Sequence, residues 1–261
     1  VTSSAGSHMN DLGLLNIGYY IPTGSNYKGS ISEITVFAQA ITTEAGALNA
    51  NQLAYYGIST TTWTGNTDSD WTKTTNWLPE VVPNSSSPSI VVIPNTPNKP
   101  VIGESVTAPA TSILVQSGAT LTVNAGGTLQ LYGSLVGTGG NCYINGTLEF
   151  MNTGQTIISG TYNAGTISNL KLSGAGGSLV SMATDLKVQN DLNFGTFSKL
   201  YIQNSKLTLN GTVTGAGTQA LRGSTYATLE IAGSAAPVIS FDQFLPYNNI
   251  RYLIISTTGV V

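Results

Sequence analysis

The sequence predicts an all-β protein whose larger, C-terminal part is a right-handed parallel β-solenoid. Short apolar couplets of the form L-x-L recur throughout residues 112–261, and Gly, Asn, Ser and Thr fill the gaps between them. Only 8% of the residues are charged whereas 41% are hydrophobic, so the chain can bury a core while carrying little surface charge. Tandem β-sandwich domains are the alternative fold.

The cadence of the couplets favours a solenoid. Neighbouring couplets most often start six to eight residues apart, which is too close for ordinary hairpins of five-residue strands. In each couplet two side chains point to one face and the middle one to the other. Stacked coils would therefore pile the aliphatic pairs into a narrow core. The couplets are ILV at 113, LTV at 121, LQL at 129, CYI at 142, LEF at 148, LKL at 170, LKV at 186, LNF at 192, LYI at 200, LTL at 207 and LEI at 229.

Two regions precede the solenoid. Residues 1–58 contain alternating stretches that predict short strands within 10–41, followed by helical spacing from Thr42 to a stop at Gly57. Residues 59–111 are rich in Thr, Ser, Asn and Pro, and five of the ten prolines of the chain lie within 81–104. We expect this second region to be a connector that caps the solenoid, with one apolar strand at 90–93 kept at a sheet edge by the prolines.

Residues 29–58 resemble the end of a known domain family. The sequence GSISEITVFAQAITTEAGALNANQLAYYGI is similar to the last strand and closing helix of laminin-G-like, concanavalin A-like jelly rolls in secreted Bacteroidota proteins. This resemblance implies that residues 1–58 are the C-terminal portion of such a sandwich, closed by a short helix. Most of the ligand-binding rim of such a domain would be missing.

Residues 61–102 carry a second resemblance. The pattern Trp-x-Gly, Trp, Asn-Trp, Val-Pro and Ile-Pro is similar to the module opening of very large Bacteroidota surface proteins. The coils that follow, with ATLTVNAGGTLQLYGSL, resemble the repetitive β-solenoid modules of the same proteins. Such proteins are exported by the type IX secretion system and act as adhesins or surface filaments. The resemblance therefore implies an extracellular, cell-surface location and a structural or adhesive role rather than an enzymatic one.

The three tryptophans of the chain, Trp63, Trp71 and Trp77, lie in the stretch TWTGNTDSDWTKTTNW. Because the end of a solenoid exposes strand edges and apolar core, we expect these indoles to cover it. A glycan-binding platform of exposed indoles is the alternative.

Asn66, Asp68 and Asp70 in the same stretch are spaced like the first half of a calcium loop. Trp71 follows where a calcium loop has Gly, so a turn capped by Asx hydrogen bonds is the favoured interpretation. We expect no cofactor, with calcium at these three residues as the alternative.

Enzyme chemistry has few candidates in this chain. His8 is the only histidine, and it lies in the tetrad Gly6-Ser7-His8-Met9, which matches an expression-vector scar or is native. Asp185 and Asp191 are carboxylates that a polysaccharide-cleaving β-helix could use, but six residues of separation place them at different corners. We therefore expect no catalytic residues.

The remaining expectations concern partners and context. The net charge of −3 and the scattered Lys and Arg argue against nucleic acid as a partner. Cys142, the single cysteine, is expected to be a buried apolar side chain. No apolar run is long enough to cross a bilayer. We expect a segment of a longer chain that acts as a stalk or filament and whose partners are surface glycans or other surface proteins.

Overall fold

The computed structural model describes residues 59–85, 89–215, 220–233, 239–242 and 249–256, together with the backbone of 19–20 and 25–26. The chain divides into two compact units, residues 1–57 and 58–261. In the first unit the short strands β1 (Tyr19–Tyr20) and β2 (Ser25–Asn26) pair in antiparallel fashion. The rest of the expected jelly-roll end and the expected helix at 42–58 lie outside the described residues.

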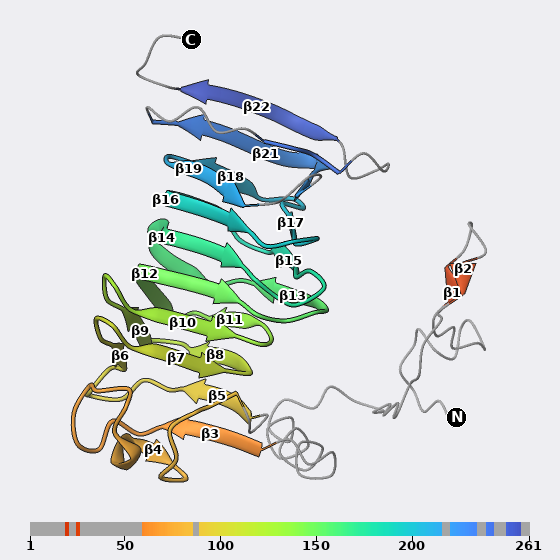
Figure 1. Ribbon diagram of the computed structural model, residues 1–261. Coiled ribbons are helices and arrows are strands. Elements are labelled where there is room, and N and C mark those ends of the chain that lie inside the picture. Colours follow the sequence, from red (N-terminus) through yellow and green to blue (C-terminus); the bar gives the residue numbers. More distant parts are fainter. Residues whose placement is uncertain are drawn as a thin grey trace, which may run out of the picture. The chain divides into compact units, whose positions relative to one another are not determined.

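The second unit is a β-solenoid of about 7 turns (Figure 1). Each coil contributes strands to two sheets. We call the sheet with nine strands the narrow sheet and the sheet with eleven strands the wide sheet. In the described residues, the narrow sheet contains nine strands in the order β20 (Leu221–Arg222), β17 (Lys199–Tyr201), β15 (Leu179–Met182), β13 (Gln155–Ile158), β11 (Leu135–Thr138), β8 (Ser112–Gln116), β5 (Ser89–Ile93), β3 (Ser59–Trp63) and β4 (Trp77–Leu78).

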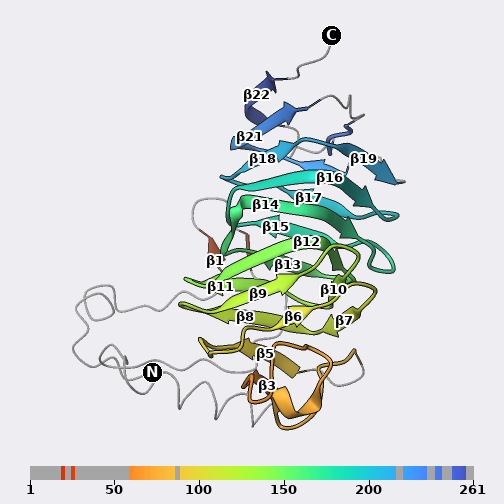
Figure 2. The same ribbon diagram turned by 90° about the vertical axis from the view of Figure 1, so that its left-hand side faces the viewer.

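The wide sheet runs alongside it and contains eleven strands in the described part of the chain. Its main path is β22 (Ile250–Ser256), β21 (Ser224–Ala232), β18 (Lys206–Leu209), β16 (Leu186–Phe194), β14 (Thr161–Leu172), β12 (Asn141–Phe150), β10 (Thr128–Leu131) and β7 (Thr107–Ala110). To this path are added β6 (Val101–Ile102), β9 (Thr120–Val123) and β19 (Thr212–Gly215). The strands stack one above another in both views (Figure 2).

The strand pairing excludes tandem β-sandwiches for residues 59–256. Among the described strand pairs of these two sheets, all are parallel except β3 with β4. A β-sandwich is built mainly from antiparallel neighbours. The expected solenoid is therefore confirmed in this unit.

The aliphatic couplets form the core, as expected from their spacing. Leu129, Leu148, Leu170 and Leu192 occupy successive positions of one inward column and are fully buried. Val91, Ile113 and Leu135 form the corresponding column of the narrow sheet. Every couplet residue that was expected to face inward is buried except Ile231, which is partly buried.

The solenoid begins earlier than the expected boundary at residue 112. Strand β3 pairs with β5, and β5 pairs with β8, so Thr61, Val91 and Ile113 lie in one column. Strands β6 and β7 follow β5 along the chain and complete its coil in the wide sheet. The expectation that 90–93 form an edge strand is wrong, because β5 contains no proline and pairs with β3 on one side and with β8 on the other. Pro109 lies in β7, which does end the path of its sheet.

The two ends of the stack of described strands differ in how they are covered. The β3 side is covered by the segment that contains β4 and the 3-10 helix η1 (Thr74–Asn76). On the other side, β22 leaves Leu253 and Ile255 largely exposed, at 60% and 59%.

Within the described residues, none of the helical segments has the length and apolar character that crossing a bilayer requires.

Candidate functional site

The three tryptophans form a compact cluster inside the protein, at the side of the stack covered by β4. Trp77 packs edge-to-face on both neighbours, with ring centroids 4.9 Å from Trp63 and 4.7 Å from Trp71. The side chains of all three are at most 1% exposed. Trp63 Nε1 donates a hydrogen bond to the Asn98 carbonyl, and Trp77 Nε1 donates to the carbonyl of Trp71.

This burial corrects one alternative from the sequence. Stacking of a sugar requires an exposed indole face, and the tryptophans at 63, 71 and 77 offer none in this structure. The cluster is instead continuous with the hydrophobic core of the coils, as a cap requires.

The polar loop beside the cluster is organised by Asn76, which is fully buried. Its Oδ1 accepts hydrogen bonds from the backbone N–H groups of Thr67 and Asp68, and its Nδ2 donates to Asp68 Oδ1 and to the Asp70 carbonyl. One amide side chain thus fixes both flanks of the loop. The sequence analysis did not identify Asn76, because its role depends on contacts with residues six to nine positions away.

Asp68 and Asp70 form the expected Asx turns. Asp68 Oδ1 accepts the Asp70 N–H, and Asp70 Oδ1 accepts the Thr72 N–H. Lys73 forms an ion pair with Asp68. This contact contributes most to lowering the pKa of the Asp68 carboxyl to about 2, and the hydrogen bonds from Asp70 and Asn76 lower it further. Asn66 is exposed in the same loop. Among the described residues no group of three or more His, Cys, Asp or Glu side chains gathers around a common point.

The two carboxylates considered for catalysis are separated by the structure. Asp185 precedes β16 and accepts the backbone N–H of Lys206. Asp191 lies in the second half of β16, which pairs with β19, and accepts hydrogen bonds from the hydroxyls of Thr212 and Thr214 in the next coil. Each carboxylate therefore ties one coil to its neighbour, and only Asp185 lines a depression.

Cys142 lies in β12 and is 1% exposed, as expected from the sequence. Burial raises the pKa of its thiol to about 12. Its register partner Tyr162 is also buried. The thiol therefore stays protonated and unreactive near neutral pH.

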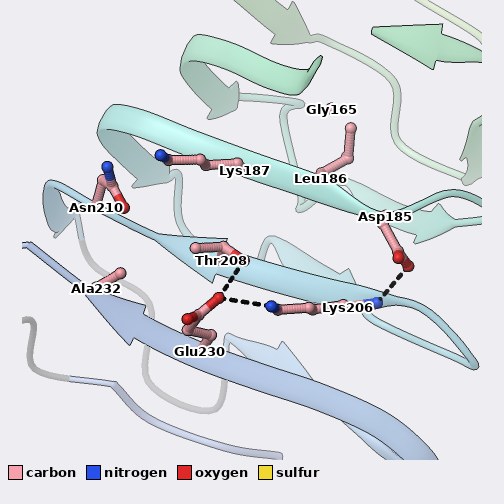
Figure 3. Close-up of a pocket in the computed structure, with 9 residues that line it drawn as sticks. All are labelled: Gly165, Asp185, Leu186, Lys187, Lys206, Thr208, Asn210, Glu230 and Ala232. Carbon is pink, nitrogen blue, oxygen red and sulfur yellow. Dashed lines mark hydrogen bonds and ion pairs between the residues drawn. The ribbon is translucent and has the colours of Figure 1, made fainter. Parts of the chain in front are cut away.

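A polar surface depression is the most developed candidate for a binding site (Figure 3). It lies on the wide sheet across β16, β18 and β21, has a volume of about 320 Å³, and is lined by Gly165, Asp185, Leu186, Lys187, Lys206, Thr208, Asn210, Glu230 and Ala232. Lys187, Thr208 and Glu230 occupy successive positions of one outward column. Neighbouring strands are about 4.8 Å apart, so this column places three polar groups over roughly 10 Å.

Most side chains in the depression are held by their neighbours. Lys206 Nζ lies 2.7 Å from Glu230 Oε2, and the Thr208 hydroxyl donates to the same oxygen. The Ser256 hydroxyl donates to the other oxygen of Glu230. The hydrogen bond from Lys206 contributes most to lowering the pKa of the Glu230 carboxyl, and those from Ser256 and Thr208 lower it further.

Comparison with known proteins found a similarity for one part of the chain. A family model described as a domain of unknown function (DUF8693) matches residues 62–151. Neither the comparison with curated proteins nor that with solved structures found a match. The matched stretch runs from Thr62 in β3 to Met151 just after β12, so it contains the tryptophan cluster and the first coils but not the depression. In residues 62–151 this chain is thus similar to that family.

Proposed function

We propose that this chain is an extracellular, non-enzymatic segment of a large bacterial surface protein, in which a right-handed solenoid acts as a stalk or filament that presents binding domains. One observation carries the proposal. Among the described residues, the inward columns continue from Thr61 and Val91 through the coils to Leu229 without a polar layer that would divide the core into separate domains.

The hydrogen bonding of the coils supports a mechanical role. Backbone hydrogen bonds between parallel strands run along the long axis of a solenoid, so each coil is fixed to the next over its full width. Side chains add further links between coils, for example the ion pair of Lys171 with Glu149 and the hydrogen bond from Gln130 to the same carboxylate. Such an arrangement resists bending.

The resemblance of residues 29–58 and 61–102 to Bacteroidota surface proteins supports the location and the export route. A polypeptide that works outside a cell also benefits from few cleavage sites, and this one has only nine Lys and Arg. The end of a laminin-G-like sandwich in residues 1–58 belongs to the same proposal.

The first experiment tests whether the number of coils sets the length of the solenoid. Ile113 in β8 and Leu135 in β11 are register partners, so deletion of residues 113–134 removes one coil and keeps the faces of the sheets. Fluorophores attached at Ser85→Cys and Thr225→Cys should then come closer by about 4.8 Å. Cys142 is buried and should remain unlabelled. Deletion of 113–133 is the matched control, because a slip of one residue exchanges the two faces and should lower the melting temperature.

The second experiment tests the location and the role. Antibodies against residues 59–256 should label intact cells of the producing organism, and labelling that requires permeabilisation would reject an extracellular stalk. Cells that carry the 113–134 deletion should display the protein normally but attach less well to their substratum. Unchanged attachment after removal of the whole solenoid would contradict the presenting role.

A further inference from the structure

We propose that the depression on β16, β18 and β21 binds a short stretch of an acidic polysaccharide, with a sugar carboxylate at Lys187 and sugar hydroxyls at Thr208, Asn210 and Glu230. This proposal is independent of the stalk function, because a stalk needs no ligand. It also differs from the glycan platform considered for the tryptophans, which are buried at the other side of the stack.

Lys187 is the residue that selects an anion. In the part of the chain that the structure describes, its ammonium has neither an ion-pair nor a hydrogen-bond partner. By contrast, the ammonium groups of Lys73, Lys171, Lys199 and Lys206 all pair with carboxylates. An unpaired cation that lines a depression is available to a carboxylate of a ligand, and such charge-assisted hydrogen bonds are among the strong ones.

The other lining groups favour a sugar over a simple anion. Asp185 and Glu230 balance Lys187 and Lys206, so the depression as a whole is not strongly positive. A phosphate-rich polymer needs an excess of cations, whereas a uronic acid carries several hydroxyls for each carboxylate. The two carboxylates can accept hydrogen bonds from sugar hydroxyls, and the Thr208 hydroxyl and the Asn210 amide can both donate to them and accept from them.

Asn210 supplies a second, independent observation. Its Nδ2 donates to Gln189 Oε1, while its Oδ1 is shielded from solvent and accepts no hydrogen bond within the described residues. In Figure 3 the Asn210 amide and the Lys187 ammonium lie at the same end of the depression. A ligand hydroxyl that displaces the covering groups would satisfy this acceptor next to the cation.

The lining is also largely organised before a ligand arrives. Glu230 is held by Lys206, Thr208 and Ser256, and Asp185 is held by the Lys206 N–H. Side chains that are already fixed lose little entropy on binding. A volume of about 320 Å³ is at the lower end of the usual range for ligand sites, which suits one or two sugar units of a chain that extends beyond the depression.

The chemistry of Glu230 supports binding rather than cleavage. Glycoside hydrolysis requires a carboxylic acid that stays protonated near neutral pH. The hydrogen bonds from Lys206, Ser256 and Thr208 instead lower the pKa of Glu230, so that it is ionised there.

Isothermal titration calorimetry of the full chain with tetragalacturonate, at low ionic strength, tests the proposal. We expect saturable binding that weakens as NaCl is added, and weaker or no binding of the neutral maltotetraose at the same concentration. Lys187→Gln should weaken tetragalacturonate binding about tenfold or more, and Lys187→Arg should restore most of it because it keeps the charge. Lys99→Gln is the matched control, since Lys99 lies in the loop before β6 and does not line the depression.

Three results would overturn the proposal. They are no binding of tetragalacturonate by the unmodified chain, equal binding by Lys187→Gln and the unmodified chain, or equally tight binding of maltotetraose. Since Lys187 is bonded to no described side chain, Lys187→Gln should keep the unmodified melting temperature, and this measurement separates lost binding from lost folding.

Discussion

Gly137 and Gly160 lie directly against each other in successive coils, at the corner where the narrow sheet turns into the wide sheet. A Cβ on Gly137 would be 2.7 Å from the Gly160 Cα, and a Cβ on Gly160 would be 2.8 Å from the Gly137 Cα. Gly160 also has a φ of +116°, which L-residues rarely adopt. The two backbones can approach this closely only because neither residue has a side chain.

Replacement of Gly160 by Ala should therefore destabilise the protein. The strained backbone alone costs about 1–3 kcal/mol, and the clash with Gly137 adds to it. Urea unfolding measures the effect. Gly154→Ala is the control, because a Cβ there meets nothing within 4 Å, and we expect its stability to change by less than about 0.5 kcal/mol. Equal stability of the two variants would show that this corner is not closely packed.

Trp77→Ala should unfold the capped side of the stack. The indole is 1% exposed and packs on both other tryptophans, so its removal should cost about 3–5 kcal/mol in the free energy of unfolding. Leu78→Ala, at the next position in β4, should have little effect because Leu78 is 64% exposed. Chemical unfolding followed by tryptophan fluorescence compares the two. A small cost for Trp77→Ala would contradict the role of the cluster as a cap.

Adjacent residues of β16 should respond in opposite ways. Leu192 faces the core and is fully buried, so Leu192→Ala should cost about 2–5 kcal/mol. Asn193 faces outward and donates a hydrogen bond to the Thr214 hydroxyl at an exposed position, so Asn193→Ala should cost less than about 1 kcal/mol. Thermal and urea unfolding provide both values, and a reversed order would mean that the register of this coil is wrong.

Glu149 should make stability depend on pH. Burial by itself raises the pKa of this carboxyl, but hydrogen bonds from Lys171, Ser173 and Gln130 outweigh burial and hold the pKa below its ordinary value. A lowered pKa in the folded state gives stability that is fully present above the ordinary value of about 4.5 and is lost as the pH falls through the folded value. We expect Glu149→Gln to be less stable than the unmodified chain at pH 7 and the difference to shrink below about pH 4.5.

The Asp68 loop provides a test of the calcium hypothesis. Lys73 and the N–H groups of Asp70 and Asn76 already occupy the Asp68 carboxylate, so we expect millimolar calcium to leave the melting temperature unchanged. Asn76→Ala should lower the melting temperature with or without calcium, because it removes the side chain that fixes both flanks of the loop. A clear rise of the melting temperature with calcium, lost in Asp68→Asn, would establish a metal site instead.

The coils could be predicted from the sequence because burial repeats with the alternation of a strand. Leu170 and Leu172, for example, face the core on either side of the outward Lys171. The first coil could not be predicted because β3 reads STTTW, in which Thr61 and Trp63 face inward and no aliphatic couplet is present. Its place in the stack depends on pairing with β5, which no local pattern shows.

The depression could not be predicted, because its residues are far apart along the chain. Lys187, Thr208 and Glu230 come together only through the register of β16, β18 and β21. Asp185 and Asp191 are close in sequence, yet they lie beside different strands of the next coil, β18 and β19, and each binds a different partner. In a solenoid, residues about one coil apart share a surface, whereas residues six apart need not.

The same register has a consequence for how the chain folds. Ile113 pairs with Leu135, Leu186 with Leu207, and Leu207 with Leu229, so each of these coils closes a loop of 21 or 22 residues. The entropy of loop closure therefore does not increase as the polypeptide becomes longer. Each finished coil offers the template for the next, and folding can follow the order of synthesis or of passage through a pore, without waiting for the far end of the chain.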